Sequence, residues 1–172
     1  MTAMRRKPRP EFLRRLATVL AATLALAGNT MAFAQDGQLE DLSAFPRGPL
    51  EISDGKKVKL TFDVWLADNP RRMQQGLMFV RALPDMRGML FVHEDAKPMS
   101  MWMKNTYIPL DMVFIDAQGR IQQIIEQTTP HSLAIIRSND PAMAVLEIAG
   151  GEARRLGLHP GQRVVHPALA KR

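Results

Sequence analysis

The sequence predicts a mainly β domain, a small β-sandwich or barrel-like fold with two short helices. Short apolar segments recur at regular spacing from residue 49 to residue 166, and several alternate strictly between apolar and polar residues. Turn-forming pairs such as Asp-Gly and Pro-Gly separate these segments, and only two stretches favour a helix. Many short strands with frequent turns and few helices are typical of sandwiches and barrels.

The first 34 residues predict a cleavable secretory signal peptide. Basic residues between positions 5 and 15 lead into the apolar run Leu16–Ala27, and Ala32-Phe33-Ala34 has the small-x-small pattern of a signal-peptidase site. The run is shorter than the roughly 20 residues that cross a bilayer. We therefore expect an exported, soluble protein, periplasmic or secreted, that begins at Gln35 and has no transmembrane span after cleavage.

The charge of the chain lies mostly in this leader. The net charge is +6, and the first 34 residues carry six of the 23 basic residues and one of the 17 acidic ones. The remaining 17 basic and 16 acidic residues nearly cancel. A fold that binds nucleic acid keeps an excess of positive charge, so we expect no nucleic-acid partner. Because the chain has no cysteine, disulfides and thiolate chemistry are excluded.

Residues 35–48 are polar and without periodicity, which predicts a flexible lead, and residues 49–172 predict one β-rich domain. The domain opens with a hairpin. Leu50 and Ile52 alternate, Asp54-Gly55 supplies the turn, and the second strand would bury one alternating set. That set is Val58, Leu60, Phe62, Val64 and Leu66.

Both expected helices are short. Asn69 is placed as an N-cap before Pro70, and Gly151–Leu156 would be closed by Gly157. The continuous apolar run Met89–Val92 predicts a strand buried on both faces. Further strands are expected over 99–104, 110–115, 120–127, 133–137, 144–149 and 163–166.

A set of motifs in the middle of the chain resembles a known family. The motifs are Gly76-Leu77-Met78, Arg81, Gly88-Met89-Leu90-Phe91, Trp102-Met103-Lys104-Asn105-Thr106, Pro109-Leu110-Asp111, Leu146-Glu147 and Gly150. Their order and spacing over roughly Leu50 to His166 are similar to those of the domain of unknown function 192 family. The resemblance implies a compact, β-rich and often exported domain, without an established activity.

Two carboxylates stand in strands that are otherwise apolar. Asp111 shares a strand face with Val113 and Ile115, and Glu147 shares one with Val145 and Ala149. A carboxylate removed from water needs partners or becomes neutral. Arg81 and Lys104 are candidate partners, and Asn105 and Thr106 add neutral hydrogen-bonding groups.

These six residues form the candidate ligand-binding site: Arg81, Lys104, Asn105, Thr106, Asp111 and Glu147. One interpretation is a pocket for a small polar ligand or a contact with a protein partner, in which Lys104 or Arg81 holds an anionic or hydroxyl-rich group. The other is an ion-pair network that only stabilises the sheet.

Two alternatives remain open from the sequence. Asp111 and Glu147 could form the acid pair of a hydrolase, which requires both to face one cleft. Met99, Met101 and Met103 alternate and, with His93, could bind Cu(I) in a copper carrier. Methionine also fills irregular cores. We recognise no catalytic motif and expect neither catalysis nor a cofactor.

Overall fold

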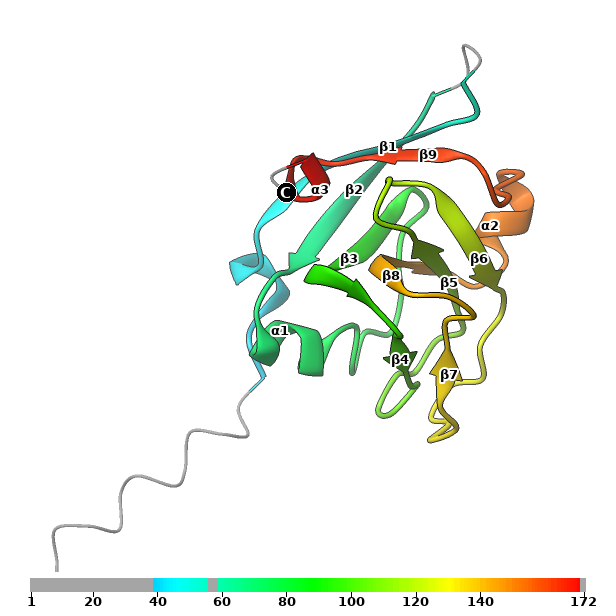
Figure 1. The fold of residues 1–172 in the computed structure, drawn as a ribbon. Coiled ribbons are helices and arrows are strands. Elements are labelled where there is room, and N and C mark those ends of the chain that lie inside the picture. Colours follow the sequence, from blue (N-terminus) through cyan, green and yellow to red (C-terminus); the bar gives the residue numbers. More distant parts are fainter. Residues whose placement is uncertain (1–38, 56–58, 171–172) are drawn as a thin grey trace, which may run out of the picture. The chain divides into compact units, whose positions relative to one another are not determined.

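The computed structural model of the chain describes residues 39–55 and 59–170, without the side chain of Lys59. The predicted signal peptide, including the cleavage site before Gln35, lies outside these ranges, as does Val58. The described chain is mainly β, as predicted (Figure 1). Its strands are β1 Arg47–Ser53, β2 Lys59–Ala67, β3 Arg87–Lys97, β4 Ser100–Met101, β5 Leu110–Ile115, β6 Ile121–Ile125, β7 Ile136–Arg137, β8 Ala142–Ala149 and β9 Arg163–Val165.

The hairpin of β1 and β2 follows the predicted alternation. The strands pair antiparallel with Leu50 opposite Phe62, and Gly55 in the connection has a positive φ of 82°. Phe62 and Val64 are fully buried, and Leu60 and Leu66 pack more loosely against the same core. The period of two along β2 therefore sets its register, because a slip by one residue would expose this whole face.

Seven strands form one curled sheet in the order β6-β5-β8-β3-β2-β1-β9. The edge strands meet, because Arg120, next to β6, forms a bridge with Arg163 of β9. The Ile121 amide also donates to the Gln162 carbonyl at 2.9 Å. This contact joins the two edges of the curl (Figure 1). Strands β4 and β7 pair separately, as a small second sheet.

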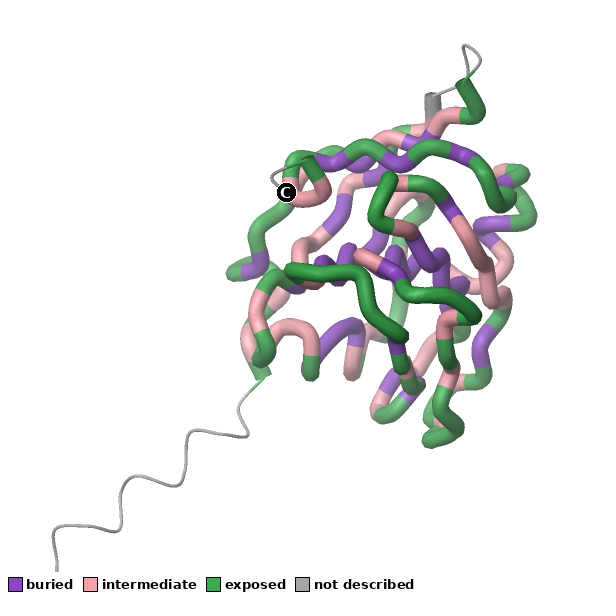
Figure 2. The backbone as a smooth tube through the Cα atoms, viewed as in Figure 1, coloured by how far each residue is buried: buried purple, intermediate pink, exposed green. Residues whose placement is uncertain are grey.

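The two faces of the sheet bury two separate hydrophobic clusters. Buried residues recur along the inner strands of the sheet (Figure 2). The first contains side chains from both edge strands, Ile121 of β6 and Val164 of β9, and so fills the interior of the curl. The second lies on the opposite face of β3, β5 and β8 and contains Met89 and Met112. Strand β3 serves both clusters, which is why Met89–Val92 is buried on both faces as predicted.

Three short α-helices accompany the sheet in the described ranges: α1 Pro70–Gln75, α2 Glu152–Arg155 and α3 Pro167–Ala170. The side chain of Asn69 caps α1 by accepting from the Arg72 amide at 3.0 Å, as predicted. Helix α2 matches the second predicted helix. Helix α3 was not predicted, because four residues give too little periodicity to detect.

The boundaries of several elements differ from the sequence prediction. A 3-10 helix η1 (Leu42–Ala44) and the first residues of β1 lie within the segment predicted as a flexible lead, and Phe45 there is buried in the second cluster. Strand β4 covers only Ser100–Met101, because the chain turns after Met103 and Asn105 has a positive φ of 57°. Only the end of the expected strand 133–137 pairs, as β7.

Candidate functional site

Asp111 is fully buried, and its partners are backbone amides. Its Oδ1 accepts from the amides of Gln127 at 2.7 Å and Gly151 at 2.9 Å, and its Oδ2 accepts from the Ala153 amide at 2.8 Å. Gly151 and Ala153 begin α2, whose N-cap residue has no side chain to cap it. The carboxylate of β5 therefore caps this helix across 40 residues of sequence. The predicted pairing of Asp111 with Lys104 or Arg81 is wrong.

The acid pair of the hydrolase alternative is wrong as well. In the register of β5 and β8, Asp111 lies opposite Ile148, and Glu147 lies opposite Met112. Ile148 belongs to the first cluster and Met112 to the second. The two carboxyl groups therefore point to opposite faces of the sheet and share no cleft.

Glu147 is also buried, at 4% exposure, but its surroundings differ. Its neighbours across the strands are Met89 and Met112, both fully buried. No hydrogen bond or ion pair joins its carboxyl to another residue of the described chain. Burial among apolar side chains raises the pKa of Glu147 from 4.5 to about 8. At neutral pH the group is therefore mostly a protonated acid.

The carboxyl of Glu147 borders a pocket of about 70 Å³. The pocket lies between the second face of the sheet, the end of α1 and the chain that follows β4. A water molecule needs about 10–15 Å³ of such space, so the pocket accommodates several waters or a few non-hydrogen atoms of a ligand. Glu147 and Lys104 are the only ionisable residues that line it in the described part of the chain.

Three of the six predicted site residues line this pocket: Lys104, Thr106 and Glu147. The Nζ atom of Lys104 lies 5.2 Å from the centre of the Trp102 ring, which is a cation–π distance. Thr106 is buried, and its hydroxyl donates to the Lys104 carbonyl at 3.4 Å. Lysine is thus held at an exposed rim, whereas the glutamic acid lies at the buried base.

Two more of the predicted residues, Asn105 and Arg81, do not line the pocket. The carbonyl of Asn105 accepts from the Phe79 amide at 2.9 Å, and its side-chain amide lies 3.9 Å from the sulfur of Met78. Met78 itself lines the pocket. The guanidinium carbon of Arg81 is 4.8 Å from the centre of the Tyr107 ring. Asn105 thus contacts a residue of the pocket wall, whereas Arg81 is exposed and lies against Tyr107.

The methionine face that the copper alternative requires is not accessible. Met103 is fully buried and its sulfur accepts from the Thr128 hydroxyl at 3.1 Å, and Met99 is buried in the second cluster. Of the three, only Met101 lines the pocket. His93 lines a different hollow, beside Asp68 and Asp95. Met99 and Met103 therefore pack the core.

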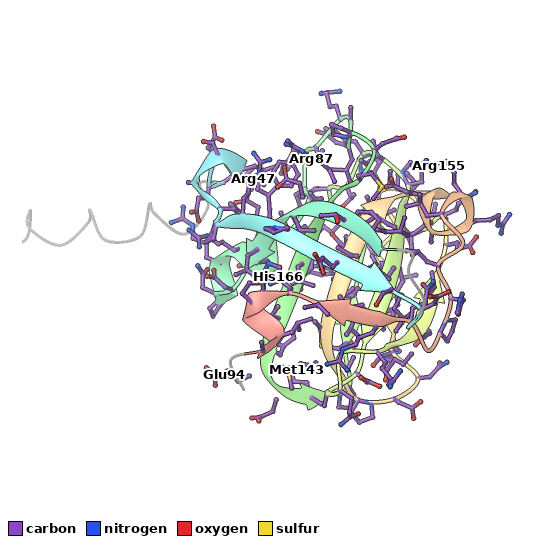
Figure 3. All side chains as sticks on the ribbon, turned by 90° about the horizontal axis from the view of Figure 1, so that it is seen from above. Arg47, Arg87, Glu94, Met143, Arg155 and His166 are labelled. Carbon is purple, nitrogen blue, oxygen red and sulfur yellow. The ribbon has the colours of Figure 1, made fainter. Side chains whose placement is uncertain are left out.

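A larger hollow, of about 810 Å³, lies beside the first residues of β1 and β3 and the middle of β2. Arg47 and Arg87 lie side by side there (Figure 3), and both make ion pairs with Asp63. Both guanidinium groups also lie within 6 Å of the centre of the Trp65 ring. Both arginines therefore already have an ion-pair partner, whereas Glu147 has none in the described part of the chain. The smaller pocket is the better candidate site for this reason.

Five residues of the family motifs line the pocket although they were not predicted as site residues: Gly76, Leu77, Met78, Phe91 and Trp102. Gly76 has a positive φ of 50°, and a Cβ atom there would lie 3.2 Å from Phe91. A glycine is therefore needed where α1 ends against the sheet. The family motif Gly76-Leu77-Met78 was the only sequence signal for this part of the pocket. Its role as a pocket wall is visible only in the fold, where it lines the same pocket as Glu147.

No curated protein matches the chain. Two crystal structures resemble it with a TM-score of 0.70 each. The first, a candidate transcription regulator from Sinorhizobium meliloti 1021, is 38% identical and matches over 77% of this chain and 99% of its own. The second, a protein of unknown function from Novosphingobium aromaticivorans DSM 12444, is 32% identical and matches over 75% of this chain and 91% of its own. The family model of domain of unknown function 192, described as an uncharacterised ACR, matches residues 51–166, and the chain belongs to this family.

Proposed function

We propose that the protein is an exported binding module for a small ligand, and that the ligand enters the pocket over Glu147. The observation that supports this is a carboxyl group that is buried, has no partner in the described chain and borders a cavity. Burying such a group without a hydrogen bond costs several kcal/mol. A bound ligand that supplies the missing partner would recover part of this cost.

The complementary ligand presents an ammonium group to Glu147. The other buried residues that line the pocket carry no charge: Leu77 and Phe91 are apolar, and Gln75 and Thr106 are neutral polar residues. Among the described residues, a positive charge at the base therefore finds only one counter-charge, that of Glu147. Ionising a group of pKa about 8 at pH 7 costs about 1.4 kcal/mol. A charge-assisted hydrogen bond, worth about 1.5–3 kcal/mol, offsets that cost.

The rim suits the opposite end of the same ligand. Lys104 supplies a cation there, Trp102 supplies an apolar face, and Ser100 supplies a hydroxyl. A small zwitterion, with an amine at the base and an anionic group at the rim, therefore matches both ends. This arrangement keeps the role of Lys104 that the sequence suggested and assigns the inner end to Glu147.

Proton release tests this proposal. The mature domain is titrated in a calorimeter at pH 7 with ethylamine, with glycine as a small zwitterion and with acetate, in two buffers of different ionisation enthalpy. Because Glu147 is protonated before binding, an ammonium ligand expels close to one proton. Glu147→Gln removes both binding and proton release, and Lys104→Gln weakens glycine more than ethylamine.

The control variant is Glu94→Gln, which removes one negative charge from an exposed position on β3. It leaves the titration unchanged. Binding of acetate alone, without proton release, would contradict the ammonium assignment. Failure of all three probes to bind the wild type more tightly than Glu147→Gln would reject the proposal for ligands of this size.

A further inference from the structure

Three segments at one end of the domain combine exposed apolar side chains with a lack of acidic residues. They are residues 76–84, 98–109 and 127–138, which we call the acid-free end. None of these segments contains Asp or Glu, although 17 of the 172 residues of the chain are acidic. Arg81, Lys104 and Arg137 are exposed cations within them.

The three segments lie together in the fold, at the end of the molecule that carries β4 and β7 (Figure 1). The Met103 amide donates to the Ser132 carbonyl at 3.1 Å, and the Phe79 amide donates to the Asn105 carbonyl at 2.9 Å. The Tyr107 ring lies 5.7 Å from Phe79 and 5.2 Å from His131. The cationic and apolar side chains of the three segments therefore belong to one surface.

This surface carries most of the large apolar side chains that the described residues expose. Six such side chains are exposed, and four belong to the acid-free end: Phe79, Trp102, Leu133 and Ile135. Leu133 is 66% exposed and Ile135 46%, in the loop that leads into β7. Clusters of exposed apolar groups of this kind mark interaction sites.

We infer that the acid-free end docks on the surface of a membrane that contains anionic lipid. Aromatic side chains such as Trp102 and Tyr107 are favoured in the headgroup region of a membrane. The aliphatic side chains of Leu133 and Ile135 suit the boundary between the headgroups and the acyl chains. Cations at the same end attract the negative surface potential of anionic lipid. A protein partner with mixed charges fits this surface less well, because its basic groups would find no acid in these three segments to pair with.

Vesicle sedimentation of the mature protein tests this inference, with vesicles of phosphatidylglycerol mixed with phosphatidylcholine and with pure phosphatidylcholine. We expect binding to the anionic vesicles that weakens with added salt. Leu133→Ser with Ile135→Ser should lower the binding constant about ten- to a hundredfold. Arg137→Gln should lower it about fivefold. These positions do not line the pocket over Glu147, so ligand binding there stays intact.

The matched control is Val165→Ser, which removes an equally exposed aliphatic group from β9, outside the acid-free end. It leaves vesicle binding unchanged. Equal binding by the wild type and the double variant would overturn the inference. So would concentration-dependent dimerisation, measured by sedimentation velocity, that the double variant abolishes while vesicles bind neither protein, because a second copy would then cover this surface.

Discussion

Glu147 has no partner among the described residues, and this leads to a quantitative prediction about how the stability of the protein depends on pH. Glu147 has its pKa raised from 4.5 to about 8 by burial. Between these two values the folded protein holds a proton that the unfolded chain has lost, so the free energy of unfolding falls as the pH rises. The stability contributed by the protonated acid is fully present below about pH 4.5 and is lost as the pH approaches 8.

The size of the effect follows from the same two pKa values. Each unit between them is worth about 1.4 kcal/mol, so the loss is about 3 kcal/mol at pH 7 and approaches about 5 kcal/mol above pH 8. Glutamine has the shape of the protonated acid and does not titrate. Glu147→Gln should therefore match the wild type at pH 4 and be more stable by about 3–5 kcal/mol at pH 7 to 8.

Urea unfolding at a series of pH values between 4 and 9 measures this difference, with ligand-free protein and the free energy extrapolated to water. Other titrating groups contribute equally to both proteins and cancel in the difference. Glu94→Gln at the exposed end of β3 serves as the control, because it makes the same change of acid to amide outside the pocket. Parallel curves for Glu147→Gln and the wild type, or a less stable variant at pH 8, would refute the reasoning, since the carboxylate would then have a partner.

Three further predictions concern the fold and its leader. Gly88→Ala should lower the free energy of unfolding by about 1–3 kcal/mol, measured in urea, because the added Cβ would lie 2.5 Å from the Glu147 carbonyl oxygen. Thr128→Val should cost about 1–2 kcal/mol in the same measurement, because the Leu110 amide loses the hydroxyl that accepts from it at 3.2 Å. Mass spectrometry of the exported protein should find Gln35 at the N-terminus; intact residues 16–27 would show that the leader is retained.

The parts of the fold that could be predicted are those with local signals. The alternation along β2 predicted its buried face, and the pair Asn69-Pro70 predicted the start of α1. The alternation along β5 also predicted that Asp111 and Leu110 point to opposite faces, as they do. These features depend on the periods of single elements and on caps, which are visible in a few consecutive residues.

The parts that could not be predicted depend on contacts between distant segments. The shortening of β4 results from the turn at Asn105, whose positive φ the predicted strand did not anticipate. The burial of Met99 and Met103 depends on the layer that covers β3, β5 and β8. The pocket itself is formed by chain segments around residues 75, 103 and 147, which no short sequence window contains.

The same limit applies to the two carboxylates, and a comparison of variants separates their roles. The carboxylate of Asp111 accepts hydrogen bonds from three backbone amides, whereas the carboxyl of Glu147 accepts none in the described chain. In Asp111→Asn, an amide NH₂ must face at least one of these donors, so the free energy of unfolding at pH 8 should fall by about 2–4 kcal/mol. Glu147→Gln, an equivalent change of acid to amide, should raise it under the same conditions. Equal signs for the two variants would mean that both acids serve the fold alike, and a neutral Asp111→Asn would show that its three hydrogen bonds do not support α2.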